Sequence, residues 1–163
     1  MKKIFYIISI WIICMFLSSC AGYKPIFSST DLPFKISKYS LNGNKQLSNQ
    51  IYKKLQMISE RNKDKSNNIR RINLSIQVLK NKKTTAKNTA GKILEYRIEL
   101  TTNIIVKDFL TDKTILDHTF NSFSSYKVQD QHSETLKMEN KTTENLLNQI
   151  FADLLIKLTE NII

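Results

Sequence analysis

The sequence predicts an α+β fold, a two-layer sandwich in which two helices pack on a four-stranded, mainly antiparallel sheet in the order β-α-β-β-β-α. Three observations lead to this prediction. Segments with alternating apolar and polar residues indicate strands with one buried face. Two segments repeat apolar residues every three or four positions, which indicates helices with one apolar face. Short connections join the last three strands, so we expect these strands to form an antiparallel meander.

The predicted domain covers residues 33–163 and begins with a strand and a helix. The strand has alternating apolar residues with one break, which indicates a bulge or bend, at Phe34, Ile36, Tyr39 and Leu41. Asn42-Gly43-Asn44 ends this strand. A helix of about four turns follows. Its apolar residues are Leu47, Ile51, Leu55 and Ile58.

The next three strands form the predicted meander. Alternation is strict from Ile72 to Val78, and the polar segment Asn81–Gly91 is expected to carry the next turn. A long alternating strand follows from Leu94 to Val106, and a fourth runs from Ile115 to about Val128. Each of these strands has one face that can be buried by the helices.

The chain ends in a second predicted helix, which starts between Ser133 and Thr143. Its apolar residues lie on one broad face and are Leu147, Ile150, Phe151, Leu154, Leu155, Leu158 and Ile162. This helix completes the layer that covers the sheet.

The amino terminus has the pattern of an export signal. Lys2 and Lys3 precede the uncharged run Ile4–Leu17, which spans only about 21 Å as a helix and is too short for a bilayer core of about 30 Å. Leu17-Ser18-Ser19-Cys20 resembles the lipobox of bacterial lipoproteins. We therefore expect a lipoprotein signal peptide at residues 1–19 and a lipidated tether at residues 20–32. The alternative is an unprocessed signal anchor with an incidental cysteine.

The resemblance to the lipobox implies that Cys20 carries diacylglycerol and an N-acyl chain, which would hold the protein on a membrane. Cys14 lies in the signal, so the mature chain has no cysteine pair for a disulfide or a thiolate metal site. In such lipoproteins an aspartate after the cysteine marks retention in the inner membrane, so the resemblance, with Ala21 at this position, implies the outer membrane. Export also argues against a nucleic-acid partner. No cofactor other than the covalent lipid is expected.

The sequence does not predict an enzyme. His118 and His132 are too far apart for a His-x-x-x-His metal site, and adjacent Asp117 and His118 point to opposite faces of a strand. There is no Gly-x-Ser-x-Gly motif, phosphate-binding loop or dinucleotide fingerprint. We therefore predict no catalytic residues and no metal site.

Positive charge is concentrated in one part of the chain, whose formal net charge is +11. Ten basic residues and one acidic residue lie between Arg61 and Lys92. Four of the lysines fall near the turn predicted after the second strand, where ammonium groups can contact phosphates: Lys80, Lys82, Lys83 and Lys87. The alternative is that they only keep an exposed turn solvated.

Two segments resemble the LPS-assembly lipoprotein family (LptE). Cys20-Ala21-Gly22-Tyr23-Lys24-Pro25-Ile26-Phe27 is similar to that family's mature start, although the family has Gly directly after the cysteine, where this chain has Ala21. Glu144–Leu158 is similar to the family's last helix. The predicted element order is also that family's architecture.

The resemblance implies an outer-membrane lipoprotein that plugs a lipopolysaccharide-assembly β-barrel (LptD-like) and assists lipopolysaccharide insertion. Its domain would lie on the periplasmic side or within the barrel, and the four lysines above would be candidates for lipopolysaccharide phosphate contacts. Two other classes stay open at this point. One is an auxiliary lipoprotein of a lipid-transport ABC system, and the other is a periplasmic hydrolase.

Overall fold

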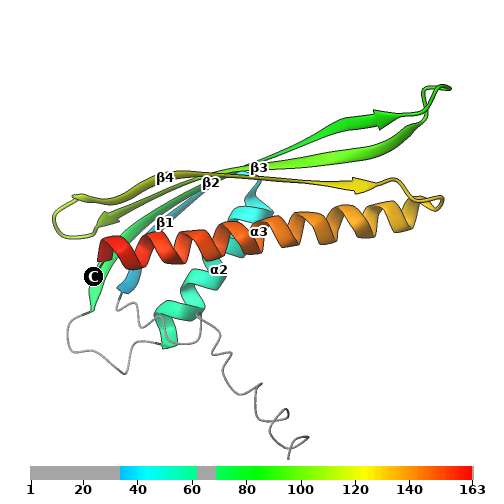
Figure 1. Ribbon diagram of the computed structural model, residues 1–163. Helices are drawn as coiled ribbons and strands as arrows, with labels where there is room; N and C mark the ends of the chain where they lie inside the picture. Colours follow the sequence, from blue (N-terminus) through cyan, green and yellow to red (C-terminus); the bar gives the residue numbers. More distant parts are fainter. Residues whose placement is uncertain (1–33, 62–68, 163) are drawn as a thin grey trace, which may run out of the picture. The chain divides into compact units, whose positions relative to one another are not determined.

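The computed structural model describes residues 34–61 and 69–162, which form four strands and two helices. Both helices lie on one face of the sheet, and no described element covers the other face (Figure 1). The predicted α+β class and element order are confirmed. In chain order the elements are β1 (Phe34–Gly43), α2 (Lys45–Arg61), β2 (Arg70–Lys87), β3 (Ile93–Asp108), β4 (Thr114–Lys127) and α3 (His132–Ile162).

The strands lie side by side in the order β1-β2-β3-β4. β1 and β2 are parallel, because α2 carries the chain back to the starting end of the sheet. The other two pairs are antiparallel, joined by short turns. The expected bulge in β1 is confirmed as a register shift between Ile36 and Lys38.

The junction between β1 and α2 is tightly built. Gly43 has a φ of 69°, and a Cβ placed on it would lie 2.2 Å from the carbonyl oxygen of Val78. The next amide, that of Asn44, donates a hydrogen bond of 2.7 Å to the same oxygen. The Asn44 side chain accepts a hydrogen bond from the amide of Leu47 and so caps α2. This position therefore requires glycine for both conformation and space.

One apolar core fills the space between the sheet and the helices. β2 contributes every second residue from Ile72 to Val78, as its alternation predicted. The largest fully buried side chains are Phe34, Ile51, Leu55, Ile72, Ile76, Ile98, Leu100, Ile104, Leu147, Ile150 and Leu154. Two polar side chains, Ser48 and Ser59 of α2, are also buried and donate hydrogen bonds to backbone carbonyls of β1.

Two predicted boundaries were wrong. β2 does not end near Val78 but continues to Lys87, so the turn expected within Asn81–Gly91 is confined to the end of that segment, between Lys87 and Ile93. α3 begins at His132, one residue before the predicted range. In both places the chain is regular but has few apolar side chains, so the hydrophobic pattern did not reveal its structure.

The paired residues Val78, Thr102 and Phe120 divide the sheet into two halves. The proximal half contains all of β1, and its strands continue to the β3–β4 turn. The distal half contains only β2, β3 and β4 and ends at the β2–β3 turn. Figure 1 shows the last turns of α3 near the proximal end and its first turns under the distal half.

Candidate functional site

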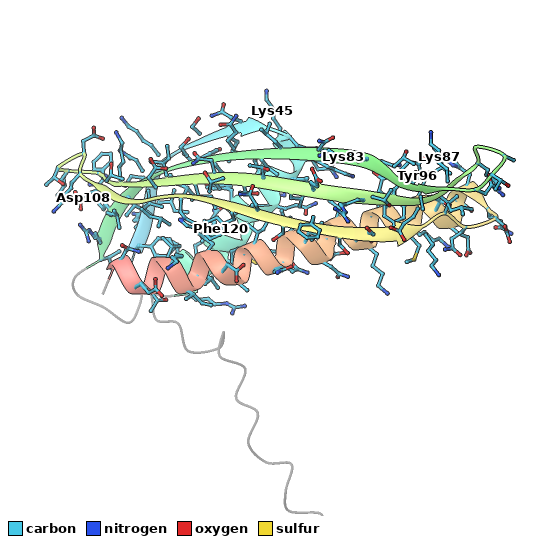
Figure 2. The ribbon with its side chains drawn as sticks, turned by 45° about the horizontal axis from the view of Figure 1, so that its top comes forward. Lys45, Lys83, Lys87, Tyr96, Asp108 and Phe120 are labelled. Atoms are coloured by element: carbon cyan, nitrogen blue, oxygen red, sulfur yellow. The ribbon has the colours of Figure 1, made fainter. Side chains whose placement is uncertain are left out.

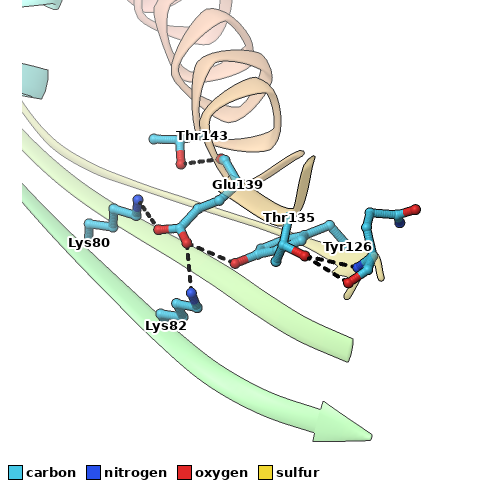
Figure 3. A network of polar contacts seen from close by, with 7 residues as sticks. Lys80, Lys82, Tyr126, Thr135, Glu139 and Thr143 are labelled. Carbon is cyan, nitrogen blue, oxygen red and sulfur yellow. Dashed lines mark hydrogen bonds and ion pairs between the residues drawn. The ribbon is translucent and has the colours of Figure 1, made fainter. Parts of the chain in front are cut away.

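The clearest polar cluster lies in the distal half, around Glu139 on α3. Its carboxylate accepts a hydrogen bond of 2.8 Å from Lys80 Nζ and one of 2.7 Å from Lys82 Nζ. The hydroxyl of Tyr126 on β4 donates a third, of 2.9 Å. Figure 3 shows these three donors converging on the one carboxylate from two strands. We call Lys80, Lys82, Tyr126 and Glu139 the distal cluster.

The sheet pleat explains why these side chains meet. Lys80 and Lys82 follow Ile76 and Val78 on the helix-facing side of β2, so their stems continue the row of core residues. Tyr126 is on the same side of β4 and is 4% exposed. Helix α3 places Glu139 above them. The Glu139 side chain is only 15% exposed, so its negative charge needs these partners.

The cluster strongly perturbs the acid in its centre. Burial alone would raise the pKa of the Glu139 carboxyl, but the hydrogen bonds from Lys80, Lys82 and Tyr126 lower it to about 2. Burial likewise disfavours the charged form of Lys82, yet the bond to Glu139 raises the pKa of its ammonium above the ordinary value. Both partners of the Lys82–Glu139 pair are therefore ionised at neutral pH.

Aromatic rings complete the environment of Lys82. Its Nζ lies 4.1 Å from the ring centroid of Tyr96 and 5.8 Å from that of Tyr126. These distances are typical of cation–π contacts. The two tyrosine rings are themselves 5.9 Å apart. Lys82 is thus held by a carboxylate and by aromatic faces.

We expected the four lysines singled out from the sequence to lie together at the tip of a hairpin, and this prediction was wrong. Lys80 and Lys82 belong to the distal cluster, whereas Lys83 points to the uncovered face and pairs with Glu99 at 2.7 Å. Lys87 is exposed at the last residue of β2. Figure 2 shows Lys87 toward the end of the sheet opposite Asp108, and Lys83 between that end and the middle. Lys83 and Lys87 are therefore the more accessible of the four.

Several residues of the site were not predicted from the sequence. Glu139 lies 59 positions from Lys80 and precedes the apolar part of its helix, so no local pattern links the two. Tyr96 and Tyr126 were expected only as strand residues. Their direct pairing across β3 and β4 depends on the register of the meander, which the sequence does not specify.

The predicted lipidation site, Cys20, lies outside the described residues, as do the predicted signal peptide and tether. Within residues 34–61 and 69–162, no group of three His, Cys, Asp or Glu side chains is arranged to hold a metal ion. The helices in this part of the chain are not long and apolar enough to cross a membrane.

A groove of about 570 Å³ runs between α2, α3 and Lys80. Amide side chains line much of it, and no Ser, Cys or His of the described chain contributes to the lining. Its lining residues are Asn44, Gln46, Leu47, Gln50, Lys53, Lys54, Met57, Lys80, Asn140, Thr143 and Glu144.

The fold and the cluster define a small α+β domain with helices on one face of its sheet and lysines toward one end. Comparison with known proteins makes this class more specific. The chain is similar in structure to a minor lipoprotein from Acinetobacter baumannii, with a TM-score of 0.53 and 16% identity over 79% of this chain and 95% of that one.

It is also similar to an uncharacterized lipoprotein B from Nitrosomonas europaea, with a TM-score of 0.53 and 10% identity over 82% of this chain and 88% of that one. No family model matches the chain, and the curated proteins contain no significant match. At these identities the likeness concerns the fold. The chain therefore has a fold that is also found in bacterial lipoproteins.

Proposed function

We propose that the protein is an outer-membrane lipoprotein, anchored through Cys20, whose domain lies in the lumen of a lipopolysaccharide-assembly β-barrel and assists lipopolysaccharide insertion. The lipobox and the fold found in bacterial lipoproteins support the anchor. The resemblance of the mature start and of the last helix to one assembly family supports the role. The structural observation that carries the proposal is the polar character of the sheet face that no described element covers.

Near its centre this open face carries seven uncharged polar side chains beside three apolar ones, those of Leu79, Ile105 and Phe123. The polar ones are Asn73, Ser75, Gln77, Thr101, Asn103, Thr119 and Asn121. Hydroxyl and amide groups can donate or accept hydrogen bonds, so such a surface can contact the polar interior of a large barrel. Because both helices lie on the other face, this face gives the domain a broad surface to place against a partner (Figure 1).

The lysines of the distal half support contact with an anionic lipid. Lys83 and Lys87 can offer ammonium groups to phosphates without leaving a buried partner unpaired. Lys80 and Lys82 could do so only by sharing or losing the carboxylate of Glu139. We therefore propose Lys83 and Lys87 as the first of the four candidates to contact lipopolysaccharide, through binding and without catalysis.

Co-purification tests this function. Extraction of the native lipoprotein in mild detergent should recover a β-barrel protein with it. Because Thr101 lies at the centre of the open face, Thr101→Glu should abolish this recovery, whereas Gln149→Glu on the exposed surface of α3 should preserve it. Recovery of the lipoprotein alone would contradict the proposal. Recovery with an inner-membrane transporter would favour the auxiliary lipoprotein of a lipid-transport system instead.

A further inference from the structure

The turn between β3 and β4, at the proximal end, presents an apolar side chain to solvent. Leu110 is 80% exposed, the largest value among the exposed large apolar residues of the described chain. The turn around it is well braced. Asp108 accepts hydrogen bonds of 3.0 Å from the amides of Leu110 and Thr111, and its other oxygen accepts one of 2.9 Å from Arg70. Leu110 is therefore displayed by an ordered turn.

Cations lie beside the residue before Leu110. The ring of Phe109 lies 4.3 Å from the guanidinium of Arg71 and 5.9 Å from Lys38 Nζ. Neither Arg71 nor Lys38 forms an ion pair with a carboxylate of the described residues. We call this surface the proximal tip; it consists of Lys38, Arg71, Lys107, Phe109, Leu110 and Lys113.

The balance of charge at the proximal tip is positive. With Arg70, its cations number five, against two carboxylates, those of Asp108 and Asp112. Asp108 is already bonded to Arg70, and Asp112 pairs with Lys107 at 3.3 Å. An exposed apolar side chain next to a surface of net positive charge is the combination that binds the interface of a membrane containing anionic lipids.

The proximal tip lies next to the start of the described chain. Phe34, the first described residue, pairs with Arg70, and the neighbouring Arg71 carbonyl accepts a hydrogen bond from the Phe109 amide. The chain from Cys20 to Phe34 can span at most about 50 Å when fully extended. A lipid on Cys20 would therefore keep the proximal tip at a high local concentration near the bilayer surface.

We propose that the proximal tip docks on the surface of the anchoring membrane, with Leu110 inserted among the headgroups and Lys38, Arg71 and Lys113 against phospholipid phosphates. The proposal rests on the proposed function only for the anchor at Cys20; it does not require the barrel. The occupant is a bilayer containing anionic phospholipid, because the proximal tip combines apolar exposure, positive charge and attachment to the tether.

The test uses the mature lipoprotein in vesicles of phosphatidylethanolamine with phosphatidylglycerol. With Cys20 acylated and Cys14 removed, Thr111→Cys provides a single thiol beside Leu110 for an environment-sensitive fluorophore. Thr89→Cys, the same exchange in the β2–β3 turn, provides the matched control at the distal end. Brominated lipids then report which label reaches the bilayer.

We expect quenching of the label at position 111 and little at position 89. Leu110→Ser should remove most of the quenching, and each positive charge removed by Lys38→Gln or Arg71→Gln should weaken docking about fivefold. These side chains are exposed, so the variants should still fold. Vesicles of phosphatidylcholine alone should give weaker quenching than the anionic vesicles.

Equal quenching of the two labels, or none at position 111, would overturn the proposal. Shielding of position 111 only when a barrel protein is added would also overturn it and would assign the proximal tip to a protein partner. The mass of the amino-terminal peptide reports acylation of Cys20 in the same sample. The peptide mass reports the anchor, co-purification reports the barrel and quenching reports docking, so failure of one can be distinguished from failure of the others.

Discussion

The two halves of the sheet use the same strands but different chemistry. In the proximal half, the helix-facing residues of β2 include Ile76 and Val78, which are fully buried beneath the helices. Two and four residues beyond Val78, the same face carries Lys80 and Lys82, and α3 covers them with Glu139. The facing side chains of β2 and α3 therefore change from apolar to charged at the same place along the sheet.

This difference has consequences for stability. Apolar burial depends little on pH or salt near neutrality, whereas a partly buried ion cluster responds to both. The proximal half should therefore provide most of the free energy of unfolding. The distal half should open more readily when its charges are altered.

The largest effect should come from the proximal core. Ile76→Ala removes a side chain that is 0% exposed and should lower the free energy of unfolding by about 2–5 kcal/mol, through lost transfer energy and a cavity. Leu79→Ala, on the other face of the same strand and 52% exposed, should change it by less than about 1 kcal/mol. Urea denaturation of the mature protein measures both values, and similar losses would contradict the assignment of the core.

A smaller effect should separate two glycines with similar backbone angles. Gly43→Ala places a Cβ against the Val78 carbonyl and should cost about 2–3 kcal/mol. Gly91 in the distal turn has a φ of 79° but no atom within 4 Å of the added carbon, so Gly91→Ala should cost only about 1 kcal/mol. Thermal unfolding of the two variants measures this difference. Equal shifts would mean that the β1–α2 junction relaxes freely.

The distal cluster should contribute less than the core. Glu139→Gln leaves Lys80 and Lys82 without a charged partner and should cost about 1–3 kcal/mol. Hydrogen exchange should show the loss mainly in the distal half, at amides of β4 and the first turns of α3. Glu134→Gln, at an exposed position in the same helix, serves as the control. A uniform loss of protection over the whole sheet would contradict a local role for the cluster.

The pH dependence should give the smallest and most specific difference. Because the pKa of Glu139 falls from 4.5 to about 2 on folding, its contribution is complete above about pH 4.5 and is lost as the pH falls toward 2. The stability difference between the native protein and Glu139→Gln should therefore shrink toward pH 2. Urea denaturation from pH 7 to acid measures it. Asp108 also has a pKa of about 2, but it is present in both proteins. Its effect therefore cancels in the stability difference, which reports Glu139 alone.

The parts of the fold that bury apolar side chains were predictable. The broken alternation around Ile36 located a real bulge, and strict alternation defined β2 up to Val78. Beyond Val78 the strand faces the ionic part of α3, so its inward residues are lysines. A rule based on apolar alternation cannot detect such a strand. The start of α3 at His132 could not be predicted from apolar periodicity either. The apolar residues of its first turns, Leu136 and Met138, are exposed and do not mark a buried face.

The candidate site was predictable only in part. The sequence showed which lysines are concentrated near the end of β2. It did not show that two of them, Lys80 and Lys82, form ion pairs with Glu139. That contact depends on how far α3 extends beneath the distal half, and therefore on the length of β2. Leu110 was likewise not singled out, because a lone leucine in a turn has no periodic pattern around it.

The length of β2 has one more consequence, which concerns assembly. Beyond Val78, no described strand pairs with the edge of β2 that β1 borders earlier, so the backbone there offers unpaired groups to any extended chain. Lys80, Lys82, Lys83 and Lys87 lie along this segment. Strand addition would bring these positive charges against the incoming chain, which makes indiscriminate pairing unfavourable. The lysines would then protect an open edge of the sheet from pairing with unfolded chains.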